Sequence, residues 1–365
     1  MTPRSVIRPE VARLPAFQGV PTADLVDPGA VALLHLNECP YPPSPRVVEA
    51  IVAQASGLNR YAEARPARLA DRLAALTGID AARIVIGNGS DELLALISLM
   101  ALGPGDNAVM PTPSFPRYRL AAAIQGAESR LVRILPDGRN DVAGLLAAID
   151  GATRVVYACT PNNPSGAPLD EDEMERLAQG VPDSVLLVVD EAYAEFHAFE
   201  GGADALPALA RRKGPWISTR TLSKAYALAG LRVGYALASS EAIAEGLVKV
   251  KLNFNLNRLA AHAALAALDD QDHARRCIGA VVAERERMAG LLTAKGLAPL
   301  PSRANFLSFD IGRDSRPVMA AMAERGVLAR EWRDPGFDTY MRITIGLPEQ
   351  NDAALAALEA ALAPA

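Results

Sequence analysis

An uninterrupted apolar run at residues 185–189 restricts the fold of this sequence more than any other feature, and it ends on the acids Asp190 and Glu191. A strand whose apolar residues do not alternate with polar ones is buried on both faces, as in a parallel sheet covered by helices on each side. Strand-like and helix-like segments alternate around this run, which predicts an α/β layered architecture. Ligands of such sheets bind beyond the carboxyl ends of the strands, where Asp190 falls.

Composition excludes several classes of function. The 365 residues suffice for two domains, and the net charge of −5, with arginines spread among acids, argues against a nucleic-acid groove. Cys39, Cys159 and Cys277 lie far apart, which indicates reduced thiols and a cytoplasmic location. The four histidines lack the spacing of metal ligands, so we expect no metal site. No apolar run reaches membrane-spanning length, and no signal peptide is evident.

The segment 216–234 carries the clearest chemical signal. Lys224 follows a β-prone stretch, and an amine of this kind forms a Schiff base with an aldehyde cofactor when burial or nearby cations lower its pKa. The hydroxyls of Thr221 and Ser223 and the guanidinium of Arg232 are donors that suit a phosphate group. Taken alone, the pattern fits a strand, a turn and a surface lysine equally well.

A second phosphate-binding signal lies at residues 83–92. This stretch predicts a strand, a glycine turn and a helix start, with Ser90 or Asp91 near the cap. The start of a helix offers free backbone N–H groups and the positive end of the helix dipole, which favour an anion. Many such helix starts bind nothing, so this turn is informative only together with other residues.

Several residues would complete a site for one cofactor. A buried Asp190 needs a partner. One interpretation is an ion pair with the protonated ring nitrogen of pyridoxal phosphate, and the other is that Asp190 is a structural aspartate that caps the sheet. Tyr193 and Asn163 are placed to donate to the ring oxygen, and Phe115 to stack on the ring or simply to pack in the core. Together with Lys224 and the phosphate donors, they indicate a pyridoxal 5'-phosphate site.

Three motifs, at 162–166, 190–193 and 221–232, resemble the fold-type I aminotransferases, and the third resembles the histidinol-phosphate aminotransferase branch closely. The resemblance extends from residue 37 to residue 346. It implies a large pyridoxal-phosphate domain at 46–270 with a mixed, mostly parallel seven-stranded sheet. It also implies a smaller α+β domain at 271–365, joined by an N-terminal arm at 1–45, and a homodimer with shared active sites.

The resemblance also implies roles for single residues. Lys224 matches the lysine that holds the cofactor and moves the substrate proton, and Asp190 matches the partner of the ring nitrogen. The other cofactor contacts would be Tyr193 and Asn163 at the ring oxygen and, around the phosphate, Ser90, Asp91, Thr221, Ser223, Arg232 and the partner subunit's Tyr61. The substrate would be held by Arg342 at its α-carboxylate, by Arg330 at a distal phosphate, and by Asn37 and Asn305 in the pocket.

Some positions depart from the family pattern. Cys39 stands where an asparagine is usual, Ala62 where a proline follows Tyr61, and Phe17 where a tyrosine touches the substrate phosphate. Glu331 and Arg333 alter the charge beside Arg330.

The expected function is transamination between histidinol phosphate and 2-oxoglutarate. The alternatives are an aminotransferase for aromatic or other hydrophobic amino acids, a decarboxylase or lyase of the same fold, and a cofactor-binding module without turnover. A nicotinamide dehydrogenase is disfavoured because no G-x-G-x-x-G follows a strand.

Overall fold

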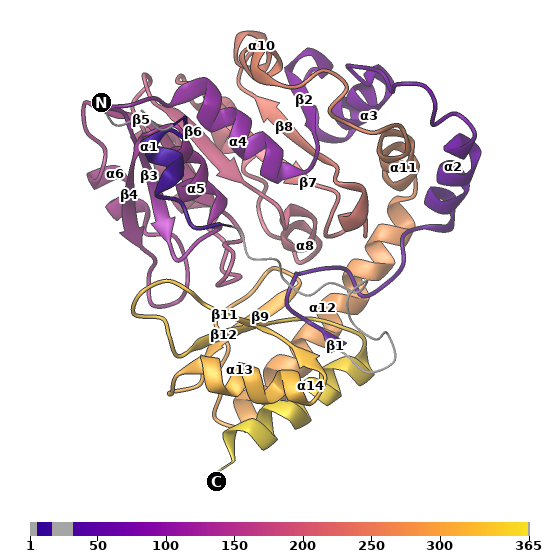
Figure 1. The fold of residues 1–365 in the computed structure, drawn as a ribbon, viewed down its shortest axis with the longest axis vertical. Coiled ribbons are helices and arrows are strands. Elements are labelled where there is room, and N and C mark those ends of the chain that lie inside the picture. The colour runs from indigo at the N-terminus through magenta and orange to yellow at the C-terminus, as the bar shows by residue number, and fades with distance from the viewer. Residues whose placement is uncertain (1–5, 17–31, 364–365) are drawn as a thin grey trace.

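The computed structural model describes residues 6–16 and 32–363, and its largest element is a seven-stranded sheet (Figure 1). In sheet order the strands are β2 (Ile84–Gly87), β8 (Gly234–Ala238), β7 (Trp216–Thr221), β6 (Leu186–Asp190), β5 (Thr153–Cys159), β3 (Asn107–Thr112) and β4 (Glu128–Arg133). Only β8 runs antiparallel to its neighbours β2 and β7; the other pairs are parallel. The predicted mixed, mostly parallel sheet is confirmed.

Helices cover both faces of this sheet because its central strands are apolar on both sides. Leu187 and Val189 of β6 belong to one core cluster and Leu186 and Val188 to another. The first cluster includes residues of α2 (Pro45–Ala55), α3 (Ala67–Thr77), α6 (Val142–Ala147), α7 (Glu171–Gly180), α9 (Leu206–Arg211) and α11 (Arg258–Asp269). The second includes residues of α4 (Ser90–Ala101), α5 (Arg117–Ile124) and α10 (Glu241–Val250).

A second, smaller layer packs beside the large sheet (Figure 1). It contains an antiparallel sheet in the order β11 (Arg330–Glu331), β12 (Tyr340–Thr344) and β9 (Phe306–Asp310), and a parallel pair of β1 (Ala32–Leu33) with β10 (Val327–Leu328). The helices α12 (Gln271–Ala294), α13 (Ser315–Glu324) and α14 (Pro348–Leu362) share its core. β1, which lies shortly before α2 in the chain, therefore belongs to the C-terminal part of the fold.

Neighbouring parallel strands bring the sequence motifs to one edge of the sheet. Asp190 ends β6, and its register partners are Cys159 at the end of β5 and Thr219 in β7. Asn163 lies four residues beyond β5, and Lys224 lies three residues beyond β7. The three motifs consequently follow three adjacent strands at their carboxyl ends.

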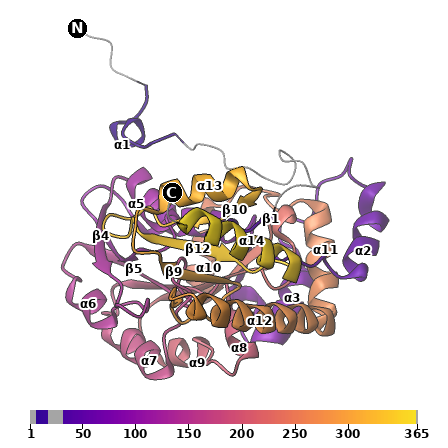
Figure 2. The same ribbon diagram turned by 90° about the horizontal axis from the view of Figure 1, so that it is seen from below.

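The structure adds elements that the sequence pattern did not predict. The short helix α1 (Pro9–Ala12) lies in the segment expected to form an N-terminal arm, and Figure 2 shows it on the outside of the molecule. Arg8 Nη2 donates to the carbonyl of Ile124 at 2.7 Å and so ties α1 to the end of α5. The helix α8 (Ala194–Phe199), directly after Tyr193, was also not predicted. The helix α9 was not predicted either, and all three helices are short, so their apolar periodicity was too brief to recognise.

Candidate active site

Lys224 is held in a partly buried position where its amine is easily deprotonated. Its Nζ donates to the carbonyl of Leu36 at 3.0 Å, which connects the turn after β7 to the loop after β1. Burial, with smaller effects from Arg342 and Arg232, lowers the pKa of Lys224 to about 7, while Glu38 opposes the shift. A lysine with such a pKa can act as a nucleophile and as an acid or base near neutrality.

Asp190 is a buried carboxylate at the end of β6. Tyr118 donates its hydroxyl to Oδ2 at 2.7 Å, and Thr219 donates to Oδ1 at 3.2 Å. Burial raises the pKa of Asp190 to about 6, and the hydrogen bonds from Tyr118 and Thr219 work against this rise. No ion pair joins Asp190 to a cation among the described residues. The carboxylate therefore lacks a positively charged partner in the part of the chain that the structure describes.

The N-terminus of α4 and Arg232 form a cradle suited to an anion. Gly89 caps α4 with φ of +83°, and a Cβ there would lie 2.6 Å from Nη2 of Arg232. A Cβ on Gly234 would lie 2.5 Å from the backbone nitrogen of Ser90. Both positions thus require glycine so that the guanidinium and the start of the helix can approach each other. The guanidinium therefore lies beside the start of α4, where backbone N–H groups favour an anion.

Two hydroxyls line this cradle from the turn after β7. Thr221 donates its hydroxyl to Ser223 Oγ at 2.9 Å, and Arg232 Nη1 donates to the same Oγ at 3.3 Å. Arg232 itself has φ of +57°, an uncommon backbone conformation for a residue with a side chain. The predicted phosphate donors Ser90, Thr221, Ser223 and Arg232 are thus brought together.

The side chain of Asp91 does not take part in this cradle. Its Oδ1 accepts from Arg117 Nε at 2.7 Å and its Oδ2 accepts from Nη2 of the same residue. This bidentate pair turns the carboxylate toward α5, and it also keeps a negative charge from an anion site. As a cofactor contact, Asp91 is therefore limited to its backbone N–H in the first turn of α4.

A hydrogen-bonded group joins the two layers of the fold next to Lys224. Asn37 Nδ2 donates to the Tyr193 hydroxyl at 2.8 Å, and Asn305 Nδ2 donates to the carbonyl of Asn37 at 3.1 Å. Thr344 donates to Asn37 Oδ1 at 3.0 Å. Asn37 adopts φ of +54°, which asparagine tolerates better than most residues. The Oδ1 atom of Asn305 is buried without a partner among the described residues.

Arg342 and Arg330 stand side by side on β12 and β11, where they are register partners. Arg342 donates to Asn163 Oδ1 at 2.5 Å and to the carbonyl of His35 at 2.7 Å, and its guanidinium lies 5.2 Å from the centre of the Phe306 ring. Burial lowers the pKa of Arg342 to about 10. In the described part of the chain neither arginine has a carboxylate partner within ion-pair distance. Two adjacent unpaired guanidinium groups favour an anionic ligand.

The three aromatic residues of the prediction differ in their positions. Phe115 is partly buried beside Tyr118, with ring centres 5.9 Å apart, and so lies near Asp190. Tyr61 is 80% exposed and stacks on Phe254 at 4.7 Å. Phe17 lies outside the described residues.

Sequence reasoning missed Tyr118, Thr219 and Thr344. For Thr344, alternation along β12 was the available signal, because residues two apart on a strand face the same side and Arg342 was already recognised. No comparable local signal pointed from Tyr118 to Asp190, since 72 residues separate them.

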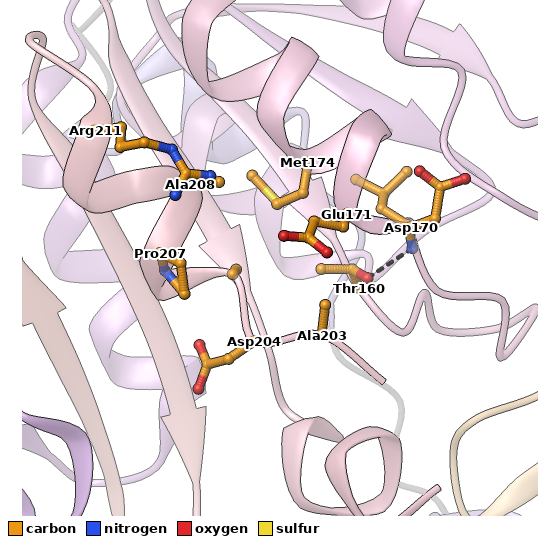
Figure 3. A pocket seen from close by; sticks show the side chains of 11 residues that line it. Thr160, Asp170, Glu171, Met174, Ala203, Asp204, Pro207, Ala208 and Arg211 are labelled. Carbon is orange, nitrogen blue, oxygen red and sulfur yellow. Dashed lines mark hydrogen bonds between the residues drawn. The ribbon is translucent and has the colours of Figure 1, made fainter. Parts of the chain in front are cut away.

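A separate hollow lies between α7 and α9 (Figure 3). Thr160, Asp170 and Arg211 are among its lining residues, and none of the predicted site residues reaches it. Within residues 6–16 and 32–363, no three His, Cys, Asp or Glu side chains are arranged to hold a metal ion. None of the helices described is both long and apolar enough to cross a membrane.

A lysine of lowered pKa, a carboxylate without a cation among the described residues and an anion cradle lie at one edge of this sheet, as expected of a fold-type I aminotransferase. Residues 30–358 match the family described as aminotransferase class I and II, and the chain belongs to this family. It is an aminotransferase, an enzyme that depends on pyridoxal 5'-phosphate.

Within the family, the chain is similar to histidinol-phosphate aminotransferases. Histidinol-phosphate aminotransferase 2 of Pseudomonas aeruginosa is 42% identical over 98% of both chains. Histidinol-phosphate aminotransferase of Bacillus subtilis is 38% identical over 90% of this chain and 91% of the relative. The crystal structure of the Sinorhizobium meliloti enzyme in complex with pyridoxal 5'-phosphate is 30% identical and superimposes with a TM-score of 0.90 over 99% of this chain and 98% of that one.

Proposed function

We propose that this aminotransferase transfers an amino group from histidinol phosphate to 2-oxoglutarate. The observation that carries the proposal is the adjacent pair Arg330 and Arg342, which stand without carboxylate partners in the described chain. Histidinol phosphate brings a phosphate and 2-oxoglutarate brings two carboxylates, so both partners of the exchange supply the anionic groups that these guanidinium groups favour.

The residues around Lys224 fit pyridoxal 5'-phosphate by charge and by shape. In the described chain no carboxylate pairs with Arg232 in the cradle of Ser90, Thr221 and Ser223, and the glycines beside it leave room for close approach. Asp190 has no cationic partner among the described residues, and a protonated ring nitrogen would supply one. We assign the ring oxygen to Tyr193 and Asn163, one ring face to Phe115, and a phosphate contact to the backbone N–H of Asp91. The bound cofactor supplies an electron sink for the bonds at the substrate Cα.

The chain's own groups supply the acid–base chemistry and the orientation. A neutral Lys224 amine accepts a proton near pH 7 and returns it, as its pKa of about 7 requires. The carbonyl of Leu36 orients that amine, at 3.0 Å from Nζ. Arg342 binds a substrate carboxylate as a bidentate pair, and its contacts to Asn163 Oδ1 and the His35 carbonyl hold the guanidinium in place. Arg330 takes the distal anion, and Asn37 and Asn305 line the pocket.

We also propose a homodimer in which each subunit completes the other's site. Tyr61 is 80% exposed and stacks on Phe254, and the large apolar side chains of Val48, Val52, Leu58, Leu252 and Phe254 are exposed as well. We propose that these side chains form one apolar surface, because a large exposed apolar surface marks a contact with a partner. A second copy seated there would cover the patch and carry Tyr61 to the partner's phosphate cradle.

We also propose that the chain divides into an arm at 1–45, a large domain at 46–270 and a small domain at 271–365. Its three cysteines are free, and we place it in the cytoplasm.

An amino-donor screen tests the substrate proposal. Purified enzyme loaded with cofactor is mixed with each donor, and the loss of the cofactor's visible absorbance is followed in a single turnover. We expect the largest rate constant per unit concentration with histidinol phosphate. The departures Cys39 and Phe17 favour aromatic amino acids as the second candidate; absorbance loss with phenylalanine and none with histidinol phosphate would establish that function instead.

A further inference from the structure

The hydrogen bond from Tyr118 to Asp190 is the shorter of the two that side-chain hydroxyls donate to this carboxylate. Tyr118 donates to Oδ2 at 2.7 Å, whereas the Thr219 hydroxyl lies 3.2 Å from Oδ1. A hydrogen bond from a neutral donor to a charged acceptor is stronger than one between neutral groups. Tyr118 therefore dominates the environment of one oxygen of the carboxylate that faces the cofactor site.

The packing of its ring fixes where the Tyr118 hydroxyl points. The side chain is 1% exposed, and its ring stacks on Tyr157 with centres 4.8 Å apart and planes 12° from parallel. Phe115 meets the same ring edge-on at an interplanar angle of 78°. Tyr157 is itself anchored by a hydrogen bond of 2.9 Å between its hydroxyl and Ser98 Oγ. The donor is thus held by two ring contacts that do not involve Asp190, and one of the two rings is itself anchored by a hydrogen bond.

Burial alone would favour the neutral form of Asp190, and the other acids near it would add to that effect. Glu191 raises the pKa of Asp190 further, and the surroundings include the weakly acidic Cys159 and Tyr193. Donation from Tyr118 acts in the opposite direction and stabilises the ionised carboxylate. Burial and the nearby Asp190 charge also raise the pKa of Tyr118 well above its usual value, so the phenol donates the proton in the hydrogen bond and keeps it.

We propose that Tyr118 is a positioning residue that keeps Asp190 ionised and oriented toward the ring nitrogen of the cofactor. This role rests on the proposed function, because it requires a pyridine ring in front of Asp190. Tyr118 acts through the carboxylate and makes no cofactor contact of its own in this role.

The test compares two cofactors that differ only in the ring nitrogen. Cofactor-free wild type and Tyr118→Phe are titrated with pyridoxal 5'-phosphate and with its deaza analogue, in which a C–H group replaces the nitrogen. The variant keeps the ring contacts to Tyr157 and Phe115 and loses only the donor. We expect its affinity for pyridoxal 5'-phosphate to fall about 10- to 100-fold, as for the loss of a hydrogen bond to a charged group. Affinity for the analogue, which offers Asp190 no N–H, should not fall.

Tyr157→Phe is the matched control. It also removes one buried hydroxyl from the same aromatic stack, but that hydroxyl binds Ser98 and not Asp190. We expect its ratio of the two affinities to equal that of wild type. If Tyr118→Phe loses affinity for both cofactors equally, the role of Tyr118 is merely structural and the proposal is overturned. If its affinity for neither cofactor changes, the proposal is overturned as well.

A second substitution keeps the test decisive if Tyr118→Phe does not fold. Tyr118→3-fluorotyrosine has nearly the same shape and a stronger donor, so the preference for pyridoxal 5'-phosphate over the analogue should rise; an unchanged preference contradicts the role. Failure of the proposed function has a different signature. In that case wild type still binds pyridoxal 5'-phosphate but its absorbance does not change with histidinol phosphate, whereas failure of the positioning role leaves the ratio of the two affinities insensitive to position 118.

Discussion

Removing the amine of Lys224 should make the cofactor-free protein more stable, and the gain should depend on pH. The pKa of this lysine falls from 10.5 to about 7 on folding, chiefly through burial. Between these two values the unfolded chain holds a proton that the folded protein does not, so the stability of wild type rises as pH increases from 7 to 10.5. At pH 7 and below, the folded state carries nearly the full cost of burying the charge.

The size of the effect follows from the shift in pKa. One pKa unit corresponds to about 1.4 kcal/mol, so the shift sets an upper bound of about 4–5 kcal/mol at neutral pH. Partial exposure of the side chain reduces this, and we expect Lys224→Met to gain about 2 kcal/mol or more relative to wild type at pH 7. The pH-dependent part of this gain should vanish near pH 10.5. Loss of the hydrogen bond to the Leu36 carbonyl offsets both ends of the range equally.

Urea unfolding of the cofactor-free proteins across this pH range measures the difference. Lys213→Met, which removes an exposed lysine, controls for the loss of one positive charge. A constant difference in unfolding free energy between wild type and Lys224→Met from pH 7 to 10.5 would refute the reasoning, because it would mean that folding leaves the lysine pKa unchanged.

Three further results are expected. Arg342→Gln should raise the KM for 2-oxoglutarate about a hundredfold or more, because a desolvated charge pair is broken; Arg316→Gln, at an exposed site, should not change it, and an equal KM in both variants contradicts the carboxylate role. Burial raises the pKa of Asp190 from 3.8 to about 6, so the folded protein holds this proton more tightly and loses stability as pH rises through that window. Asp190→Asn should flatten this part of the stability profile in urea unfolding, and an unaltered slope opposes the assignment. Mixing inactive Tyr61→Ala and Lys224→Ala subunits should restore about a quarter of the wild-type sites, since each mixed dimer regains one complete site; no recovery of turnover argues against shared sites.

Local pattern was sufficient for the features that depend on neighbouring residues. The run at 185–189 predicted a strand buried on both faces because such burial leaves no polar alternation. The cradle donors Thr221, Ser223 and Arg232 lie within twelve residues of one another and are brought together by a single turn. Short-range geometry of this kind can be read from spacing.

Long-range contacts were not accessible in the same way. Thr344 and Asn37 are 307 residues apart, and only the pairing of the two layers brings them within 3.0 Å. Asp91 shows that a local pattern can also be ambiguous. An acid at the start of a helix has the same sequence pattern whether it serves an anion site or pairs with a neighbouring helix. The tertiary placement of Arg117 decides the matter for its side chain. Packing between elements, which spacing does not encode, determined each of these outcomes.

The most direct test of the cofactor site around Lys224 is reduction of the cofactor-loaded enzyme with borohydride, followed by proteolysis and mass spectrometry of the labelled peptide. The account predicts that the reduced cofactor is attached to the peptide that contains Lys224, and that Lys224→Ala carries no label. Attachment to any other lysine, or equal labelling of the variant, would contradict it.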